Sequence, residues 1–320
     1  MSGAVLTLKV NRVIDEAVDI RSFELVDPEG RLLPMFTAGA HVDIELPNGL
    51  VRQYSISSDP RDVDRYVVGV LREPESRGGS VCMHDRVGPG DRLTIHGPRN
   101  NFPLAADARH HILLAGGIGV TPMMAMVRDL AARGASFEMH YCTRSPERTA
   151  FRTDIAQSDF ADRVIFHHDN GNPADGLDIA GLLREVRPET HVYYCGPAGF
   201  MQACEMALAH WPRHTVHFEY FSVDESVEHG ENAAFKVKIA STGAVLDVPE
   251  DRTIVEVLRA NGLEVETMCE EGICGTCATV LLDGEPDHRD FVLDDEEKAR
   301  GEFIMVCCSR ARSPVLTLDL

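Results

Sequence analysis

The chain is poor in positive charge and has no long apolar run. Its 320 residues include 31 Lys and Arg against 51 Asp and Glu, a formal net charge of −20. This balance disfavours nucleic acid or an anionic membrane as partner and favours a basic protein surface. No apolar run approaches the ~20 residues of a membrane-spanning helix. The N-terminus also lacks the basic start and apolar core of a secretory signal.

The cysteines show no general pairing pattern. There are nine, an odd number, and five are scattered along the chain: Cys82, Cys142, Cys195, Cys204 and Cys308. Thiols without partners are typical of a reducing compartment, so we expect a cytoplasmic protein without disulfides.

The other four cysteines form a motif. Cys269, Cys274 and Cys277 follow the spacing C-x4-C-x2-C, and Cys307 comes after 29 further residues. This is the ligand spacing of plant-type [2Fe–2S] ferredoxins. A structural zinc site or a disulfide framework is the alternative, but zinc sites usually pair two short C-x2-C arms and only one is present. The motif therefore predicts a [2Fe–2S] cluster, and with it another region that supplies single electrons.

The remaining pattern predicts three segments. Residues 1–103 contain short alternating runs, such as 41–46 and 66–71, separated by turn signals, which is typical of an antiparallel β-barrel. Residues 104–225 alternate strands at 111–115, 137–142, 164–168, 191–195 and 216–220 with helices, one of them at 122–133. This alternation indicates a parallel sheet with crossover helices.

The third segment follows an acidic stretch without periodicity at 222–233, which we interpret as a linker. Residues 233–320 are expected to form a small half-barrel around one helix ending at Gly262. Its predicted strands are 235–239, 245–248, 278–282, 303–307 and 315–319. The cysteine loop would lie at the edge of this unit.

Two glycine-containing turns follow strands of the middle segment. G-G-I-G-V-T-P at 116–122 leads from a strand into a helix, where glycines let a diphosphate approach and the helix N-terminus offers N–H donors. C-G-P at 195–197 ends a later strand, and ligands bind at this edge of open α/β sheets. Tight packing alone sometimes produces the same glycine-rich composition as the first turn. Cys195 is either a small buried residue or a contact of the nicotinamide.

Two motifs in the first segment are suited to a flavin mononucleotide. R-Q-Y-S at 52–55 offers a cation, an aromatic ring and a hydroxyl, while R-G-G-S at 77–80 offers a second phosphate cradle. Each motif alone is also typical of an ordinary strand or loop.

The order of all these motifs resembles the phthalate dioxygenase reductase family, which includes vanillate O-demethylase reductases. The resemblance covers essentially the whole chain. It implies an FMN-binding β-barrel, an NAD(P)-binding α/β domain and a β-grasp ferredoxin domain, placed at 1–103, 104–225 and 233–320. FAD in place of FMN stays open.

The resemblance also implies site residues. The flavin contacts would be Arg52, Gln53, Tyr54, Ser55, Arg77, Gly78, Gly79 and Ser80. The nucleotide loop would be Gly116, Gly117, Gly119, Thr121 and Pro122, with Cys195, Gly196 and Pro197 at the nicotinamide end and Cys195 as the catalytic residue. Tyr220 and Phe221 stand where such reductases often place a ring near the flavin, although packing between domains explains them as well.

The chain departs from the family pattern after its second parallel strand. Where the family often has Thr-Arg-Asp, residues 143–145 read T-R-S. The missing acid removes a partner for the ribose, so Arg144 and Ser145 could face the nucleotide, and Arg144 with Arg148 could accept a 2′-phosphate. NADH is the expected cofactor, with NADPH as the alternative. Of the adjacent thiols Cys307 and Cys308, only Cys307 keeps the family spacing.

The predicted function is the reductase component of a multicomponent oxygenase. Electrons would pass from NADH through FMN to the cluster and on to a separate oxygenase, of Rieske type and acting on aromatic acids; the reductase itself would be a monomer. One alternative is an electron-carrier or redox-sensing module without NADH turnover, which would not need the flavin and nucleotide motifs. The other is a free-standing flavin or ferric reductase, which would not need the ferredoxin segment.

Overall fold

The computed structural model describes residues 4–74, 76–221, 232–267 and 269–320. The chain divides into two compact units, Met1–Phe221 and Ser222–Leu320. The predicted domain boundary at 103 lies inside the first unit. Residues 222–231, most of the predicted linker, lie outside the described residues. The division into three domains therefore stays a prediction.

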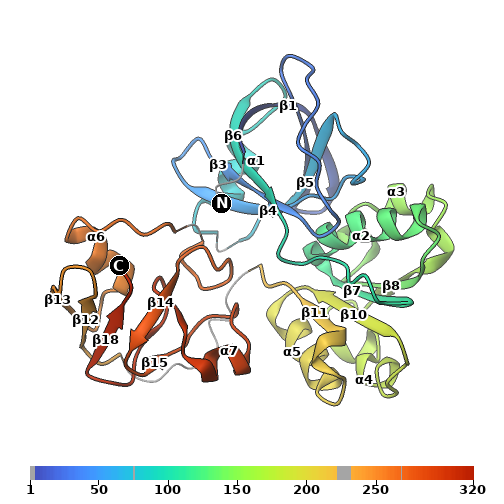
Figure 1. The fold of residues 1–320 in the computed structure, drawn as a ribbon. Helices are drawn as coiled ribbons and strands as arrows, with labels where there is room; N and C mark the ends of the chain where they lie inside the picture. The colour runs from blue at the N-terminus through green and yellow to red at the C-terminus, as the bar shows by residue number, and fades with distance from the viewer. Residues whose placement is uncertain (1–3, 75, 222–231, 268) are drawn as a thin grey trace. The chain divides into compact units, whose positions relative to one another are not determined.

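The first unit begins with six antiparallel strands (Figure 1). They are β1 (Val5–Ala17), β2 (Ile20–Val26), β3 (His41–Glu45), β4 (Val51–Ser55), β5 (Arg65–Leu71) and β6 (Arg92–Arg99). Their order is β4-β3-β6-β1-β2-β5, and a bridge between Ile56 and Val68 joins the two ends. The sheet thus closes into the predicted antiparallel barrel. One helix that the sequence reasoning missed, α1 (Gly79–Arg86), follows β5.

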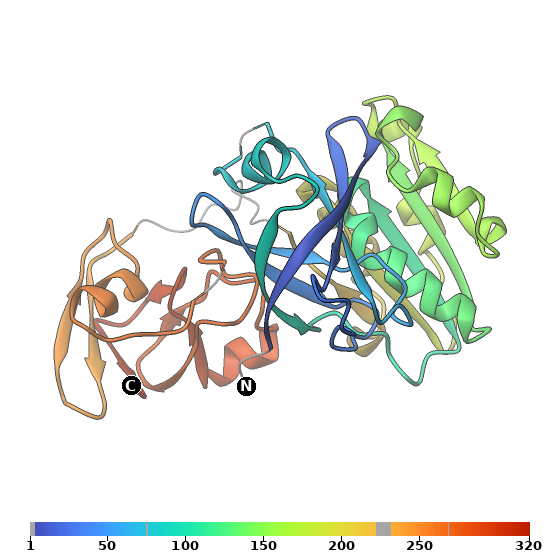
Figure 2. The ribbon, with the colours of Figure 1, turned by 90° about the horizontal axis from the view of Figure 1, so that it is seen from above.

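The second sheet of this unit is parallel throughout. Its strands are β7 (His110–Gly116), β8 (Ser136–Thr143), β9 (Val164–His168), β10 (Thr190–Cys195) and β11 (Val216–Phe218), in the order β11-β10-β7-β8-β9. The connecting α-helices are α2 (Val120–Ala132), α3 (Arg152–Ala156), α4 (Ile179–Leu182) and α5 (Ala198–Leu208). Strand order turns at β7, so the loops after β7 and β10 meet at the carboxyl edge, where ligands bind in such sheets. Figures 1 and 2 show the blue antiparallel strands and the green-to-yellow parallel strands as distinct sheets.

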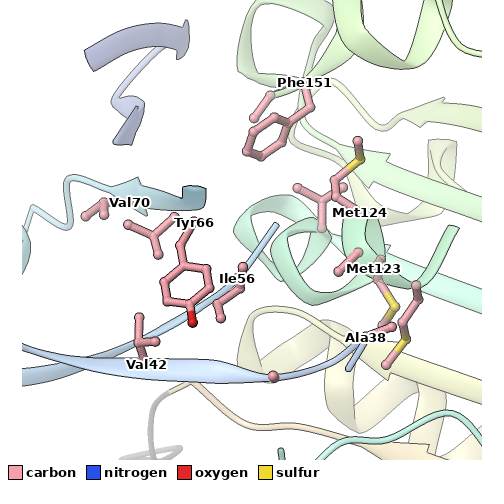
Figure 3. Packing of buried hydrophobic residues seen from close by; sticks show 14 of the residues in the cluster. Ala38, Val42, Ile56, Tyr66, Val70, Met123, Met124 and Phe151 are labelled. Atoms are coloured by element: carbon pink, nitrogen blue, oxygen red, sulfur yellow. The ribbon is translucent and has the colours of Figure 1, made fainter. Parts of the chain in front are cut away.

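One hydrophobic core continues from the barrel into the α/β part of the first unit. Tyr66 and Val70 on β5 belong to the same buried cluster as Met123 and Met124 of α2 and Phe151 (Figure 3). Alternate residues of β5 face this core, which is the two-residue period expected of a strand with one buried face. The shared core gives the flavin-side and nucleotide-side motifs a common scaffold.

The second unit is a mixed sheet with one longer helix. Its sheet has the order β13-β12-β18-β14-β16, from β12 (Phe235–Ile239), β13 (Val245–Val248), β14 (Ala278–Asp283), β16 (Phe303–Met305) and β18 (Val315–Leu318). A two-stranded ladder joins β15 (Pro286–Asp287) to β17 (Arg310–Ala311). Helix α6 (Ile254–Ala260) begins with a capping box of Thr253 and Glu256; α7 (Asp295–Arg300) precedes β16.

Several predicted boundaries shift in the structure. Helix α2 begins at Val120, two residues before the predicted start, because the glycine turn passes directly into it. Strand β11 ends at Phe218 rather than 220. Strand β16 ends at Met305 rather than 307, so Cys307 follows the strand in a turn. In the described part of the chain, no helix has the length and apolar character to cross a membrane.

Candidate functional site

The four motif cysteines come together in the second unit. The thiols of Cys269, Cys274 and Cys307 lie close enough to shift one another's pKa, and so do the thiols of Cys277 and Cys307. These contacts lower the pKa of Cys269 and Cys277, while they and burial raise the pKa of Cys274 and Cys307. Cys277 and Cys307 are buried, whereas Cys269 and Cys274 are half-buried at the loop. The predicted ligand set is therefore one spatial cluster.

The cysteine loop is shaped by residues with positive φ. Gly272 and Gly275 have φ of 77° and 74°, a conformation that favours glycine. Its backbone turns inward, so that the N–H of Glu271 donates to Sγ of Cys269 at 3.4 Å. A backbone donor of this kind stabilises negative charge on sulfur. A side chain at Gly272 would also meet Sγ of Cys308 at 2.6 Å, which places the spare thiol behind the loop.

The thiol set fits a two-iron cluster. Four cysteines, two of them half-exposed, match the ligands and the partial access that such a cluster needs. Among the described residues, no three Cys, His, Asp or Glu side chains are arranged to hold a single metal ion. A [2Fe–2S] group divides its four ligands between two irons, so it does not require such a convergence.

Arg52 and the R-G-G-S turn come together in the first unit. A Cβ at Gly79 would lie 2.8 Å from Nε and 2.9 Å from Cγ of Arg52, so the arginine passes closely over this glycine. Asn48 fixes the turn by donating from Nδ2 to the carbonyl of Gly78 at 2.9 Å. Gly78 itself has a φ of 87° at the start of α1.

This turn is suited to an anion. No side chain caps the N-terminus of α1, and its first turn has no acid. The N–H groups left uncapped at this helix end and the nearby Arg52 guanidinium both favour a phosphate. The cradle fits the phosphate of FMN, because any side chain at Gly79 would displace Arg52. Arg77 is exposed beside it, and Ser80 donates to Ser76 within the turn at 3.0 Å.

Tyr54 and Ser55 follow Arg52 on β4, and the Tyr54 phenol lies within electrostatic range of Arg52 and of Cys82 on α1. Burial raises the pKa of the Tyr54 phenol, so the ring stays neutral. Ser55 is buried and directs its hydroxyl to Oε2 of Glu219 at 3.5 Å. Glu219 follows β11, so this contact joins the barrel to the carboxyl edge of the parallel sheet. Sequence reasoning missed Glu219, although it directly precedes the Tyr220–Phe221 pair.

The two glycine turns of the parallel sheet pack against each other. A Cβ at Gly119 would lie 2.1 Å from the carbonyl oxygen of Cys195, and one at Gly196 would lie 3.0 Å from Cα of Gly116. The loops after β7 and β10 therefore meet backbone to backbone. Only glycine at position 119 lets the two loops come this close. Tight packing, one of the two explanations of the glycine-rich turn, therefore applies to Gly119.

Other predicted nucleotide residues differ in exposure. Thr121 is buried and donates to the carbonyl of Ile118 at 3.0 Å, and Pro122 is buried beside it. Arg144 and Arg148 are exposed after β8, and Arg148 lies 3.4 Å from Asp19. Gly117 has a φ of 53° and open space around it.

Cys195 ends β10 as a fully buried thiol. Burial raises its pKa, and the nearby Glu219 carboxyl raises it further. The thiol is therefore neutral, which fits a packing surface for a ring and excludes a thiolate nucleophile. Phe221, the last described residue of this unit, is 37% exposed.

Comparisons with known proteins identify relatives over nearly the whole chain. The family described as 2Fe-2S iron-sulfur cluster binding domain matches residues 237–312. The chain is 46% identical to the phthalate 4,5-dioxygenase oxygenase reductase subunit of Pseudomonas putida, covering 98% of this chain and 96% of that one. It is 48% identical to a vanillate O-demethylase oxidoreductase of Pseudomonas sp., covering 95% and 96%.

The chain belongs to the phthalate dioxygenase reductase family. The solved phthalate dioxygenase reductase, a structure titled for electron transfer from pyridine nucleotides to [2Fe-2S], matches with a TM-score of 0.76. It is 44% identical, over 99% of this chain and 98% of that one. The predicted family, the fold class and the assignment as an oxidoreductase are confirmed.

Proposed function

We propose that this phthalate dioxygenase reductase family member is the reductase component of an oxygenase system, passing electrons from NADH to a separate oxygenase. The observation that carries this function is the presence of three sites in one chain: the cradle at Arg52 and Gly79, the joined turns at Gly119 and Cys195, and the four-thiol cluster. A carrier or sensor without turnover would need only the third.

The chain's residues divide the work between binding and positioning. When bound, FMN supplies the conversion of a two-electron hydride transfer into single-electron transfers, and the [2Fe–2S] cluster carries single electrons. Arg52 and the turn at 77–80 hold the FMN phosphate, while Gln53, Tyr54 and Ser55 line the flavin. The turns at 116–122 and 195–197 hold the nucleotide, with the neutral Cys195 thiol against the nicotinamide. Cys269, Cys274, Cys277 and Cys307 hold the cluster.

The nucleotide is NADH rather than NADPH. Arg144, Ser145 and Arg148 stand at the end of β8, and Arg148 lies near Asp19 at 3.4 Å. Asp19 partly neutralises the positive charge of Arg148, which would otherwise attract the 2′-phosphate of NADPH. Because Arg144 and Arg148 are both exposed, the preference is expected to be moderate.

The electron acceptor is a Rieske-type oxygenase with a basic docking surface. Residues 233–320 contain 18 Asp and Glu against 9 Lys and Arg. Exposed charges of this kind increase association rates and give salt-sensitive contacts. We further propose that the chain is a cytoplasmic monomer with flavin, nucleotide and ferredoxin domains at 1–103, 104–225 and 233–320.

A cofactor extraction tests the proposal most directly. Acid treatment of the purified protein should release FMN, and reduced protein should give the rhombic paramagnetic resonance signal of a [2Fe–2S] centre. Turnover with ferricyanide should be faster with NADH than with NADPH. Release of FAD, or absence of any flavin, would contradict the assignment of the 77–80 turn.

Charge reversal tests the docking surface. Glu271→Lys, beside the cluster ligands, should slow electron transfer to the oxygenase more than ferricyanide reduction. Asp251→Lys, an exposed acid at the turn before α6, is the matched control. If added salt left the transfer rate unchanged in the unsubstituted protein, electrostatic docking would be wrong.

A further inference from the structure

The residue that follows the first cluster ligand has a strained backbone. Glu270 has a φ of 56°, in the left-handed region that costs free energy for a residue with a side chain. Within residues 269–277, the other positive φ values belong to Gly272 and Gly275, and glycine reaches this conformation easily. A glycine at position 270 would avoid the strain, so the reason for this residue lies in its side chain.

The side chain of Glu270 is held by Arg259, which stands in the last turn of α6. Nη1 of Arg259 lies 2.8 Å from Oε1 of Glu270, and Nη2 donates to Oγ1 of Thr267. The Thr267 hydroxyl donates in turn to Oε1 of Glu270 at 2.9 Å. The three side chains therefore form a closed ring of polar contacts that ties the cysteine loop to a helix.

This ring adds little to the stability of the fold. The side chains of Arg259 and Glu270 are 39% and 49% exposed, and ion pairs at such positions contribute only slightly because water and salt screen them. The left-handed backbone at Glu270 offsets that contribution. An exposed ion pair and a strained residue thus stand next to Cys269 without a gain in stability, which points to a role toward the cluster.

The place of the ring in the fold is suited to such a role. Thr267 and Glu270 lie on either side of Cys269 in the chain, so the guanidinium that contacts both lies beside the backbone of this ligand. A site of four thiolates becomes one charge more negative when it takes up an electron. A nearby cation therefore favours reduction, and a nearby carboxylate opposes it.

We propose that Arg259 raises the reduction potential of the [2Fe–2S] cluster and that Glu270 limits this effect while it holds Arg259 in place. The proposal rests on the cluster assignment in the proposed function. The electron comes from the reduced flavin and leaves to the oxygenase, and neither side chain gains or loses a proton. Both are positioning residues, because neither is a ligand of the cluster.

Redox titration followed by paramagnetic resonance tests the pair through a property other than turnover. Arg259→Met should lower the reduction potential, because it leaves the Glu270 carboxylate without its counter-ion. Glu270→Gln should raise the potential, because the amide still accepts hydrogen bonds while the negative charge is lost. Each change should shift the equilibrium constant for reduction about threefold, and added salt should weaken both shifts because the charges are half-exposed.

Lys236 and Asp247 provide the matched control. Nζ of Lys236 lies 2.8 Å from Oδ1 of Asp247, the same separation as in the Arg259–Glu270 pair. This second pair joins β12 to β13, at the edge of the sheet opposite to β16. Lys236→Met and Asp247→Asn should therefore leave the potential unchanged. Arg259→Lys keeps the positive charge and should retain most of the original potential, although it loses the forked geometry of arginine.

The directions of the shifts separate electrostatic tuning from a purely structural role. If Arg259→Met and Glu270→Gln moved the potential in the same direction, or released iron without a shift, the ring would only support the loop and the proposal would be wrong. Unchanged potentials with an intact cluster signal would overturn the proposal and leave the proposed function in place. Absence of the cluster signal from the unsubstituted protein would overturn the cluster assignment, and the tuning by Arg259 with it.

Discussion

The cysteine loop of the second unit and the cluster of Glu219, Ser55, His41 and Cys195 in the first unit differ in how their side chains are brought together and how exposed they are. The loop brings its thiols together through neighbouring residues and keeps two of them half-exposed. The Glu219 cluster draws Ser55 from β4, His41 from β3 and Cys195 from β10, and buries them. Local turn conformation therefore brings three of the four thiols together, with Cys307 added from the turn after β16, whereas packing between distant elements defines the whole of the second site.

The opposite arrangement matches opposite chemical needs. Partial exposure of a cluster favours electron exit to another protein. Burial removes water from Glu219 and Cys195 and keeps both protonated. Burial in the first unit therefore favours uncharged side chains, whereas partial exposure in the second leaves two thiols accessible.

Removal of one cluster ligand should have the largest effect. It tests whether the first unit can oxidise NADH without an intact cluster in the second unit. Cys274→Ala should abolish the iron–sulfur spectrum and cytochrome c reduction, because three thiolates do not complete the ligands of two irons. NADH-to-ferricyanide turnover should persist, since it draws on the first unit. Cys308→Ser, at the spare thiol, should keep both activities. Equal loss of both activities in folded Cys274→Ala would contradict this division.

Gly119→Ala should be the most damaging small substitution in the first unit. The new Cβ would lie 2.1 Å from the carbonyl oxygen of Cys195, a backbone atom that cannot turn away. We expect a loss of about 3 kcal/mol in the free energy of unfolding and weaker NADH binding. Gly199→Ala in α5 has no atom within 4 Å of its Cβ and should raise stability by about 0.5 kcal/mol. Urea denaturation measures both, and similar midpoints for the two variants would refute the close packing.

Acid should destabilise the first unit because it contains neutral histidines that are buried or half-buried. Burial lowers the pKa of His41, His111 and His217 to about 4, from 6.5 when unfolded. Between pH 6.5 and 4 each of these histidines binds more protons in the unfolded chain, so its contribution to stability falls by about 1.4 kcal/mol per pH unit as the pH is lowered. The raised pKa of Glu219 acts in the opposite direction and offsets part of this loss.

Two optical signals separate the units in this experiment. Trp211, the only tryptophan, is buried in the first unit, and cluster absorption reports on the second. Thermal melting followed by tryptophan fluorescence should shift downward from pH 7 to pH 5. If the melting temperature stayed constant across this range, the pKa values of the three histidines in the folded protein would not be lowered by burial.

Gly79→Ala should produce the smallest effect on stability and a specific effect on flavin. Its Cβ would meet the flexible side chain of Arg52 rather than backbone, so the arginine moves and the fold remains. We expect FMN affinity to fall about tenfold, or about 1.4 kcal/mol, with a nearly unchanged melting temperature. Fluorescence titration of flavin-free protein with FMN measures the affinity. If Gly79→Ala bound FMN with unchanged affinity, Arg52 would not be a contact of the FMN phosphate.

Much of the fold was predictable because its signals are local. The strands at 164–168, 235–239 and 245–248 agree with the structure to the residue. Helix α1 was missed because it follows a glycine turn and lacks a capping side chain, so no start signal marks it. Strand β16 was overextended because the apolar run 303–307 does not reveal that its last residues turn toward the cluster.

The sequence by itself determined the cysteine spacing, the phosphate-type turns and the order of the three segments, because each depends on residues close together in the chain. Only the tertiary structure placed Arg52 over Gly79, Gly119 against Cys195, and Glu219 between Ser55 and His41. The last of these could not be read from sequence, because Ser55 and Glu219 are 164 residues apart. The protonation of Glu219 is set by burial, and burial exists only once the barrel and the parallel sheet share one core.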